Sequence, residues 1–115
     1  MPNQVEEFNT YRARMNEKLL ADNNKIIKRI FNLYTNAYAE GVLDVKTKEL
    51  LGFVASTVLR CDDCVKYHLE HSREAGATKD EVMETLGIAT LVGDTIVVPH
   101  LRRAYEYWEA LEQQG

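Results

Sequence analysis

The spacing of apolar residues is the feature that most limits how this 115-residue chain can fold. Phe8, Tyr11, Met15 and Leu19 recur at intervals of three and four, which is the period of one helix face, and we expect them to lie in the core. The run 95–98 is β-branched, but it has no partner run elsewhere, so we expect it to be buried helix. The pattern therefore predicts an all-α fold.

Residues that start and stop helices divide the pattern into segments. Thr78 and Glu81 match a capping box, Gly76 ends the segment before it, and Pro99 belongs in the first turn of the last segment or kinks it. The third segment is so apolar that we expect it to be buried on most sides. One domain over 1–115 is predicted, with six helices over about 5–20, 26–38, 45–59, 61–75, 78–92 and 101–111. Asp44 is the expected cap of the third helix, which carries Glu49 near its start.

Composition excludes several classes of function. The formal net charge is −4, from 14 Lys and Arg against 18 Asp and Glu, so the chain has no electrostatic footprint for nucleic acid. The first ten residues lack the pattern of a signal peptide, and no run approaches the roughly 18 apolar residues of a membrane span. We expect a cytoplasmic protein with neither a nucleic-acid nor a membrane partner.

The two cysteines, Cys61 and Cys64, are the first candidates for chemistry. A CxxC pair is poorly suited to stapling a fold and is common in redox or metal sites of a reducing compartment. No breaker follows Cys64 until Gly76, which places the pair at the start of the fourth helix. Backbone donors at a helix start lower the pKa of a thiol from about 8.5 toward 7 or below, and the spacing allows a disulfide to close.

Two histidines continue the same face of that helix. His68 lies one turn beyond Cys64, where its imidazole can reach the sulfur directly or through one water. His71 is on the same side, but a solvated histidine is the better interpretation of it. Ten residues of helix span about 15 Å, so one helix cannot supply all four zinc ligands at bond lengths of about 2.0 to 2.3 Å. We predict neither a metal nor a cofactor.

Glu49, eleven intervening residues, Cys61-x-x-Cys64, three more residues and His68 together resemble the active-site signature of the alkylhydroperoxidase D-like branch of the carboxymuconolactone decarboxylase superfamily. The resemblance covers about 42–92. It implies that Glu49, Cys61, Cys64 and His68 are catalytic, with Glu49 and His68 as a proton relay to the dithiol. It further implies a peroxide or disulfide substrate, an external thiol or dithiol reductant, and a trimer or hexamer. A homo-oligomer is also expected because the third, fifth and sixth helices are too apolar for one small domain to bury.

One position departs from that branch. Alkylhydroperoxidase D has a histidine just before its second cysteine, where this chain has Asp63. Two alternatives to a thiol peroxidase stay open: a decarboxylase-like lyase with His68 as base, and a non-enzymatic helical subunit whose CxxC holds a metal across a subunit interface. The decarboxylase branch generally lacks the cysteine pair, which favours the dithiol enzyme.

Overall fold

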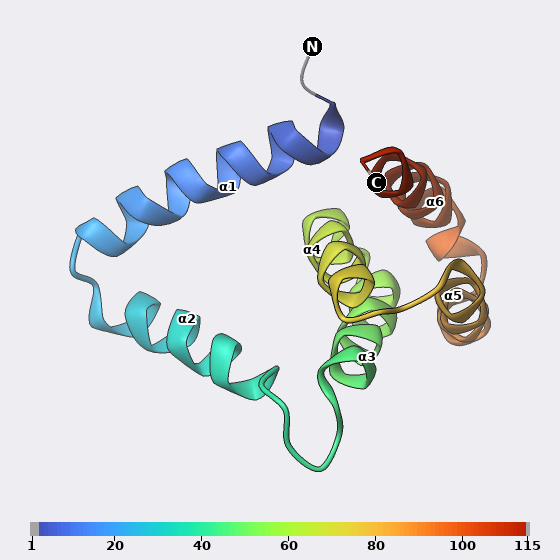
Figure 1. The fold of residues 1–115 in the computed structure, drawn as a ribbon, viewed down its shortest axis with the longest axis horizontal. Helices are drawn as coiled ribbons and strands as arrows, with labels where there is room; N and C mark the ends of the chain where they lie inside the picture. The colour runs from blue at the N-terminus through green and yellow to red at the C-terminus, as the bar shows by residue number, and fades with distance from the viewer. Residues whose placement is uncertain (1–2, 115) are drawn as a thin grey trace. The chain divides into compact units, whose positions relative to one another are not determined.

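The protein, described by a computed structural model over residues 3–114, is built from helices, with no strand among those residues. The elements are α1 (Gln4–Ala21), α2 (Lys25–Ala37), α3 (Val45–Val58), α4 (Asp62–Glu74), α5 (Lys79–Gly93), the short 3-10 helix η1 (Asp94–Val97) and α6 (Val98–Gln113) (Figure 1). The predicted all-α fold of about six helices is confirmed, and so is the cysteine pair at the start of the fourth.

The chain divides into two compact units, Met1–Ala39 and Glu40–Gly115. The first holds α1 and α2, whose N-caps Asn3 and Asn24 accept hydrogen bonds from the backbone of the following turn. The second holds α3 to α6 and every residue of the predicted site. That the whole of 1–115 behaves as one domain stays a prediction.

Helices α1 and α2 bury less than the sequence pattern predicts. In α1 only Val5 is buried, whereas Tyr11 is 51% exposed and Leu19 is 41% exposed. Helix α2 buries no residue. The expectation that the α1 stripe is core is therefore wrong, because two helices alone offer too few neighbouring surfaces to cover their apolar faces.

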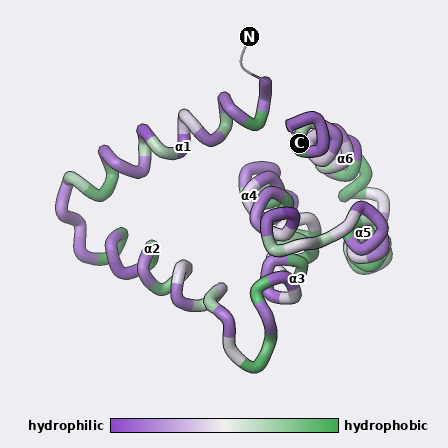
Figure 2. The backbone as a smooth tube through the Cα atoms, viewed as in Figure 1, coloured by the Kyte–Doolittle hydropathy of each residue, from purple (hydrophilic) through white to green (hydrophobic). Residues whose placement is uncertain are grey.

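The core of the second unit is formed by the inner faces of α3, α4, α5 and α6. Figure 2 shows hydrophobic segments on α3 and α5 within this unit. Its fully buried side chains include the aromatic rings of Phe53 and Tyr107. Around them lie Val65, Leu69, Val82, Leu86, Ala89, Val97, Ala104, Trp108 and Leu111.

Helix α3 is buried on a different face from the one that its apolar residues favour. Leu51 is 55% exposed and Leu59, just after the helix, is 76% exposed. The buried positions are Glu49, Gly52, Phe53, Ser56 and Thr57. The expectation of burial on most sides is wrong, because packing against α4 and α5 selects the face that carries Glu49 and Phe53 and leaves the opposite apolar face in solvent.

The start of α5 is held in two ways. The predicted capping box is confirmed: Thr78 Oγ1 accepts from the Glu81 backbone at 3.2 Å, and Glu81 Oε1 accepts from the Thr78 backbone at 2.9 Å. The other carboxylate oxygen of Glu81 lies 2.8 Å from Lys46 Nζ at the start of α3. This hydrogen bond lowers the pKa of Glu81 and raises that of Lys46. The contact ties the first turns of α3 and α5 together.

The segment between α5 and α6 is helical, but it is not the buried helix that we expected. It forms η1, in which Val97 is buried and Ile96 is 56% exposed. Pro99 then lies in the first turn of α6, where its missing backbone donor costs no helical hydrogen bond. Because a 3-10 turn keeps the chain helical while changing the direction of its side chains, only one of the branched residues reaches the core.

The stretch Lys79–Gln113 corrects one further expectation. By length and composition it passes as a membrane span, and only 22% of its most apolar window is buried within the protein. A single stretch of this kind is weak evidence for a membrane span, and this one contributes Val82, Leu86 and Trp108 to the core. Helix α5 thus contributes to the core and also retains an exposed apolar face.

Candidate active site

The junction between α3 and α4 sets the position of Cys61. The backbone N–H of Arg60 bonds to the carbonyl of Thr57, and that of Cys61 bonds to the carbonyl of Ser56, both at 3.0 Å. This is the Schellman arrangement that closes a helix, with Arg60 in the left-handed conformation at φ 63°. Cys61 is thus the last residue bound to α3 and also the N-cap of α4.

The two sulfurs lie at the positive end of the α4 dipole. Cys61 and Cys64 form a disulfide whose Cα atoms are 5.3 Å apart, within the usual range for such bonds. The Cys64 backbone N–H donates to Cys61 Sγ at 3.3 Å. A backbone donor and the helix dipole both favour a negative charge on sulfur, so this position suits a thiolate when the disulfide is reduced.

Glu49 and His68 meet in the interior between α3 and α4. Glu49 Oε1 lies 2.8 Å from His68 Nδ1, and the two side chains are 4% and 3% exposed. An ionised carboxylate only accepts hydrogen bonds, so Nδ1 carries the proton and Nε2 is the basic nitrogen of the ring. The structure therefore brings together the two predicted relay residues: Glu49 comes from α3, and His68 lies on α4, one helical turn beyond Cys64.

A second histidine–carboxylate contact lies at the start of α4, and the sequence pattern did not indicate it. His100 Nδ1 of α6 lies 2.6 Å from Asp62 Oδ1, and an Arg103 guanidinium nitrogen lies 3.3 Å from Asp62 Oδ2. Asp62 is the residue directly after Cys61. No local spacing relates it to α6, because the contacting residues are 38 and 41 positions apart.

Within the described part of the chain, the cluster of side chains that could hold a metal ion is Glu70, His71 and Glu74. These groups lie beyond His68 on α4, and Glu74 is exposed. Exposed acidic groups of this kind are common without a metal. Because both sulfurs are in a disulfide, they are not available as thiolate ligands in this state.

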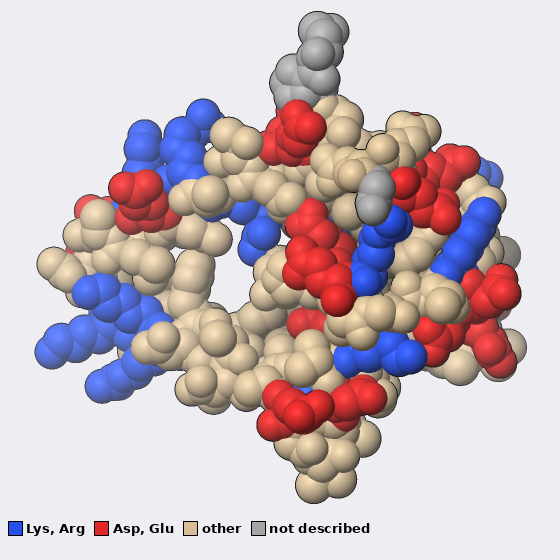
Figure 3. Space-filling view, in the orientation of Figure 1, with Lys and Arg blue, Asp and Glu red and all other residues tan. Residues whose placement is uncertain are grey.

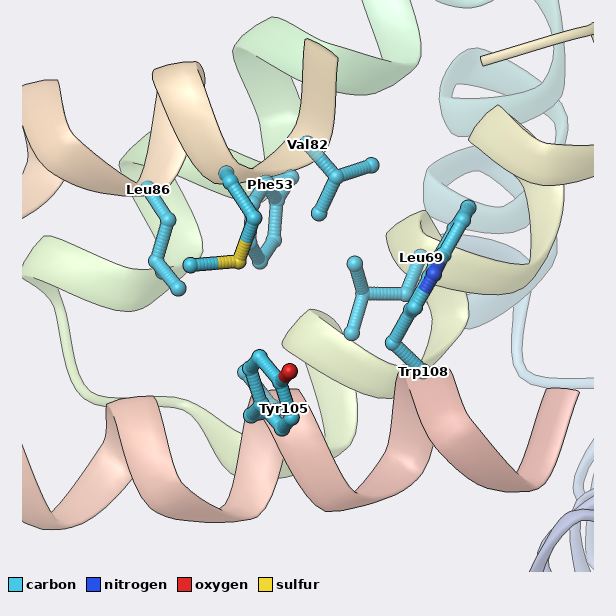
Figure 4. Close-up of a pocket in the computed structure, with 8 residues that line it drawn as sticks. Phe53, Leu69, Val82, Leu86, Tyr105 and Trp108 are labelled. Atoms are coloured by element: carbon cyan, nitrogen blue, oxygen red, sulfur yellow. The ribbon is translucent and has the colours of Figure 1, made fainter. Parts of the chain in front are cut away.

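An apolar cavity in the core is separate from these polar contacts. It is lined by side chains that include Phe53, Leu69 and Trp108, with Tyr105 at one side (Figure 4). Its volume of about 10 Å³ is barely enough for one water molecule. The cavity is a packing gap and is too small for an organic substrate.

The model of the carboxymuconolactone decarboxylase family matches residues 25–107, which include Glu49, both cysteines and His68. The chain belongs to the carboxymuconolactone decarboxylase family. The recognised resemblance to its alkylhydroperoxidase D-like members is confirmed. Alkyl hydroperoxide reductase AhpD of Mycobacteroides abscessus is 42% identical over 50 residues, which are 44% of this chain and 29% of that protein.

Other relatives extend the similarity over more of the chain. The crystal structure of TM1620 from Thermotoga maritima is 51% identical, with a TM-score of 0.91 over 94% of this chain and 95% of that one. In a second crystal structure, which is 50% identical, the same Thermotoga maritima protein is described as a carboxymuconolactone decarboxylase family protein connected with an antioxidative response. Uncharacterized protein 4 in the cox locus of Paracoccus denitrificans is 30% identical over 58% of this chain and 60% of its own length. The chain thus spans less than two thirds of the Paracoccus protein and of AhpD.

Family membership, the AhpD-like relation and the cysteine pair are the findings that bear on the function of this chain. The family model does not by itself distinguish lyase from dithiol chemistry, because it bears the name of a decarboxylase. The Cys61–Cys64 pair is the feature that separates the two chemistries, because the decarboxylase branch generally lacks it.

Proposed function

We propose that this carboxymuconolactone decarboxylase family protein is a thiol-dependent peroxidase or disulfide oxidoreductase that works through Cys61 and Cys64. The observation that carries the proposal is the buried 2.8 Å contact between Glu49 of α3 and His68 of α4, the helix whose N-cap is Cys61. A buried carboxylate is costly unless it is paired, and this pair lies one turn from a sulfur nucleophile. Such a pair can accept and return the proton that thiol chemistry moves.

The proposed cycle has three steps. The thiolate attacks the peroxide oxygen, which breaks the O–O bond and leaves a sulfenic acid on the protein and an alcohol or water as product. The other thiol attacks the sulfenic sulfur, forming the Cys61–Cys64 disulfide and releasing water. An external dithiol then gives two electrons and two protons to the disulfide and is itself oxidised. Such a donor is available in the cytoplasm, where we place the protein.

We assign the first attack to Cys64, because His68 lies one helical turn beyond it and can remove its proton. Cys61 is then the resolving residue. Its sulfur accepts the Cys64 backbone N–H at 3.3 Å, which stabilises it as an attacking thiolate and as a leaving group when the disulfide is reduced.

Mass spectrometry of the peroxide-treated protein tests the proposed function. One equivalent of hydrogen peroxide should convert the reduced protein to a form lighter by two hydrogens, with Cys61 joined to Cys64 in one chain. Added dithiol should restore the starting mass. A protein that stays reduced under these conditions, or that forms only bonds between chains, contradicts the proposal.

We also propose that the protein assembles as a homo-oligomer, a trimer or a hexamer. Its exposed apolar side chains are extensive: on α2 they include Ile30 at 56% and Leu33 at 69%, and on α5 they include Leu91 at 84%. Patches of this kind mark interaction surfaces in soluble proteins. The charge distribution favours a second copy of this chain as the partner of these surfaces. Residues 1–39 carry six Lys and Arg against four Asp and Glu, residues 40–115 carry eight against fourteen, and the basic side chains gather over α1 and α2 in Figure 3.

Sedimentation at micromolar concentration should therefore show an assembly larger than one 13.2 kDa chain. Leu33→Glu should weaken it, because a charge would be buried without a partner. Asn32→Glu is the matched control, since it places the same charge on the polar side of α2 and should leave the assembly intact. Sedimentation of the unmodified protein as a monomer alone contradicts this proposal.

A further inference from the structure

The first residue of α4, Asp62, is held by two side chains of α6. Its Oδ1 atom lies 2.6 Å from His100 Nδ1, and its Oδ2 atom lies 3.3 Å from the guanidinium of Arg103. The His100 side chain is only 16% exposed and that of Asp62 is 34% exposed, so solvent screens this contact less than it would a surface pair. A carboxylate only accepts, so His100 donates its Nδ1 proton to Asp62.

The residue held by this contact, Asp62, is the direct neighbour of Cys61 in the chain. It directly follows Cys61 and precedes Asp63 and Cys64 in the first turn of α4, so its carboxylate belongs to the same turn as the disulfide. A carboxylate near a sulfur opposes thiolate formation, and a cation bound to that carboxylate offsets the opposition. His100 donates a hydrogen bond to this carboxylate and Arg103 brings a guanidinium charge to it, both from α6.

We propose that His100 and Arg103 are positioning residues that act through Asp62 to stabilise the reduced form of the Cys61–Cys64 pair, making its disulfide a stronger oxidant. This inference rests on the proposed redox function and names two residues that regulate the same site. Stabilising the reduced form is a known way to raise the potential of a CxxC pair. The half-reaction consumes two electrons and two protons from a dithiol donor, which becomes a disulfide.

The test is the equilibrium between the protein disulfide and a glutathione buffer at pH 7, measured for single and double variants. His100→Phe removes the hydrogen bond to Asp62 and should lower the equilibrium constant for reduction about tenfold, equivalent to about 30 mV for two electrons. His100→Gln keeps a donor and should fall between His100→Phe and the unmodified protein. Asp62→Asn should shift the equilibrium in the opposite direction.

The double variant decides whether His100 acts through Asp62. In the Asp62→Asn background, His100→Phe should change the equilibrium constant less than about twofold, because the charge that it compensates is already absent. Arg103→Gln is a second readout at an exposed position, where folding is not at risk, and should shift the equilibrium in the direction of His100→Phe. Arg102→Gln, an exposed neighbour on α6, is the control for a general loss of positive charge and should have no effect.

Two results would overturn the inference: equal constants for His100→Phe and the unmodified protein, or an undiminished His100→Phe effect in the Asp62→Asn background. Either result would mean that the His100–Asp62 contact only links α4 to α6 and does not affect the sulfurs. A protein that equilibrates with glutathione but ignores peroxide would count against a peroxidase, while the same constants would still decide the role of His100.

Discussion

Replacing either cysteine by serine should abolish the turnover of peroxide that passes through the Cys61–Cys64 disulfide. Cys64→Ser removes the proposed nucleophile, and its rate should fall by about 10³-fold or more, as when other catalytic nucleophiles are lost. Cys61→Ser should react once with peroxide at close to the normal rate and then stop as a sulfenic acid, because no thiol in the chain can resolve it. Peroxide consumption under single and multiple turnover measures both effects.

The two single variants and the double variant separate the open assignments. If Cys64→Ser keeps the fast reaction and Cys61→Ser loses it, the roles of the two residues are reversed. The double variant also tests the decarboxylase-like alternative, in which His68 alone acts as base. A lyase activity that survives without both sulfurs would replace the dithiol proposal. Far-UV circular dichroism shows whether each variant is folded.

Glu49→Gln and His68→Gln should each slow oxidation of the reduced thiols at neutral pH by about 10²-fold, the usual contribution of a positioned acid–base group. The carboxylate stabilises a protonated imidazole, which in turn stabilises a thiolate one turn away. The two groups act as one unit, so the double variant should be little slower than either single variant. Rates should recover toward pH 9, where solvent removes the proton that the relay no longer accepts. Stopped-flow oxidation between pH 6 and 9 measures this.

Folding controls matter for these variants because Glu49 and His68 are both buried. Glutamine keeps hydrogen-bonding atoms at each position, which limits the cost of leaving the partner unpaired. His71→Gln is the matched control: His71 lies on the same helix, its side chain is 32% exposed, and it should oxidise at the unmodified rate. If the pH–rate curves of the two relay variants overlay that of the unmodified protein, the Glu49–His68 contact is helix packing and the dithiol works alone.

Local chemistry explains why much of the fold could be predicted from the sequence. A helix start depends on residues within one turn, so the capping box of Thr78 and Glu81 was visible in the sequence. Gly76 ends α4 at φ 99°, a conformation that other residues rarely adopt, and its glycine was equally visible. The contact between Glu49 and His68 spans 19 residues, and only the resemblance to a known signature placed the two in one site.

The sequence by itself determined where the helices begin and end and that the cysteine pair lies at the start of one of them, because these depend on hydrogen bonds within about four residues. Tertiary structure alone decided which face of α3 is buried, since Leu51 and Leu59 are as apolar as any core residue yet lie in solvent. It also decided that Asp62 meets His100, 38 positions away. Such contacts depend on how whole helices pack against each other, and the periodicity of one helix contains no information about the residue that its neighbour brings to it.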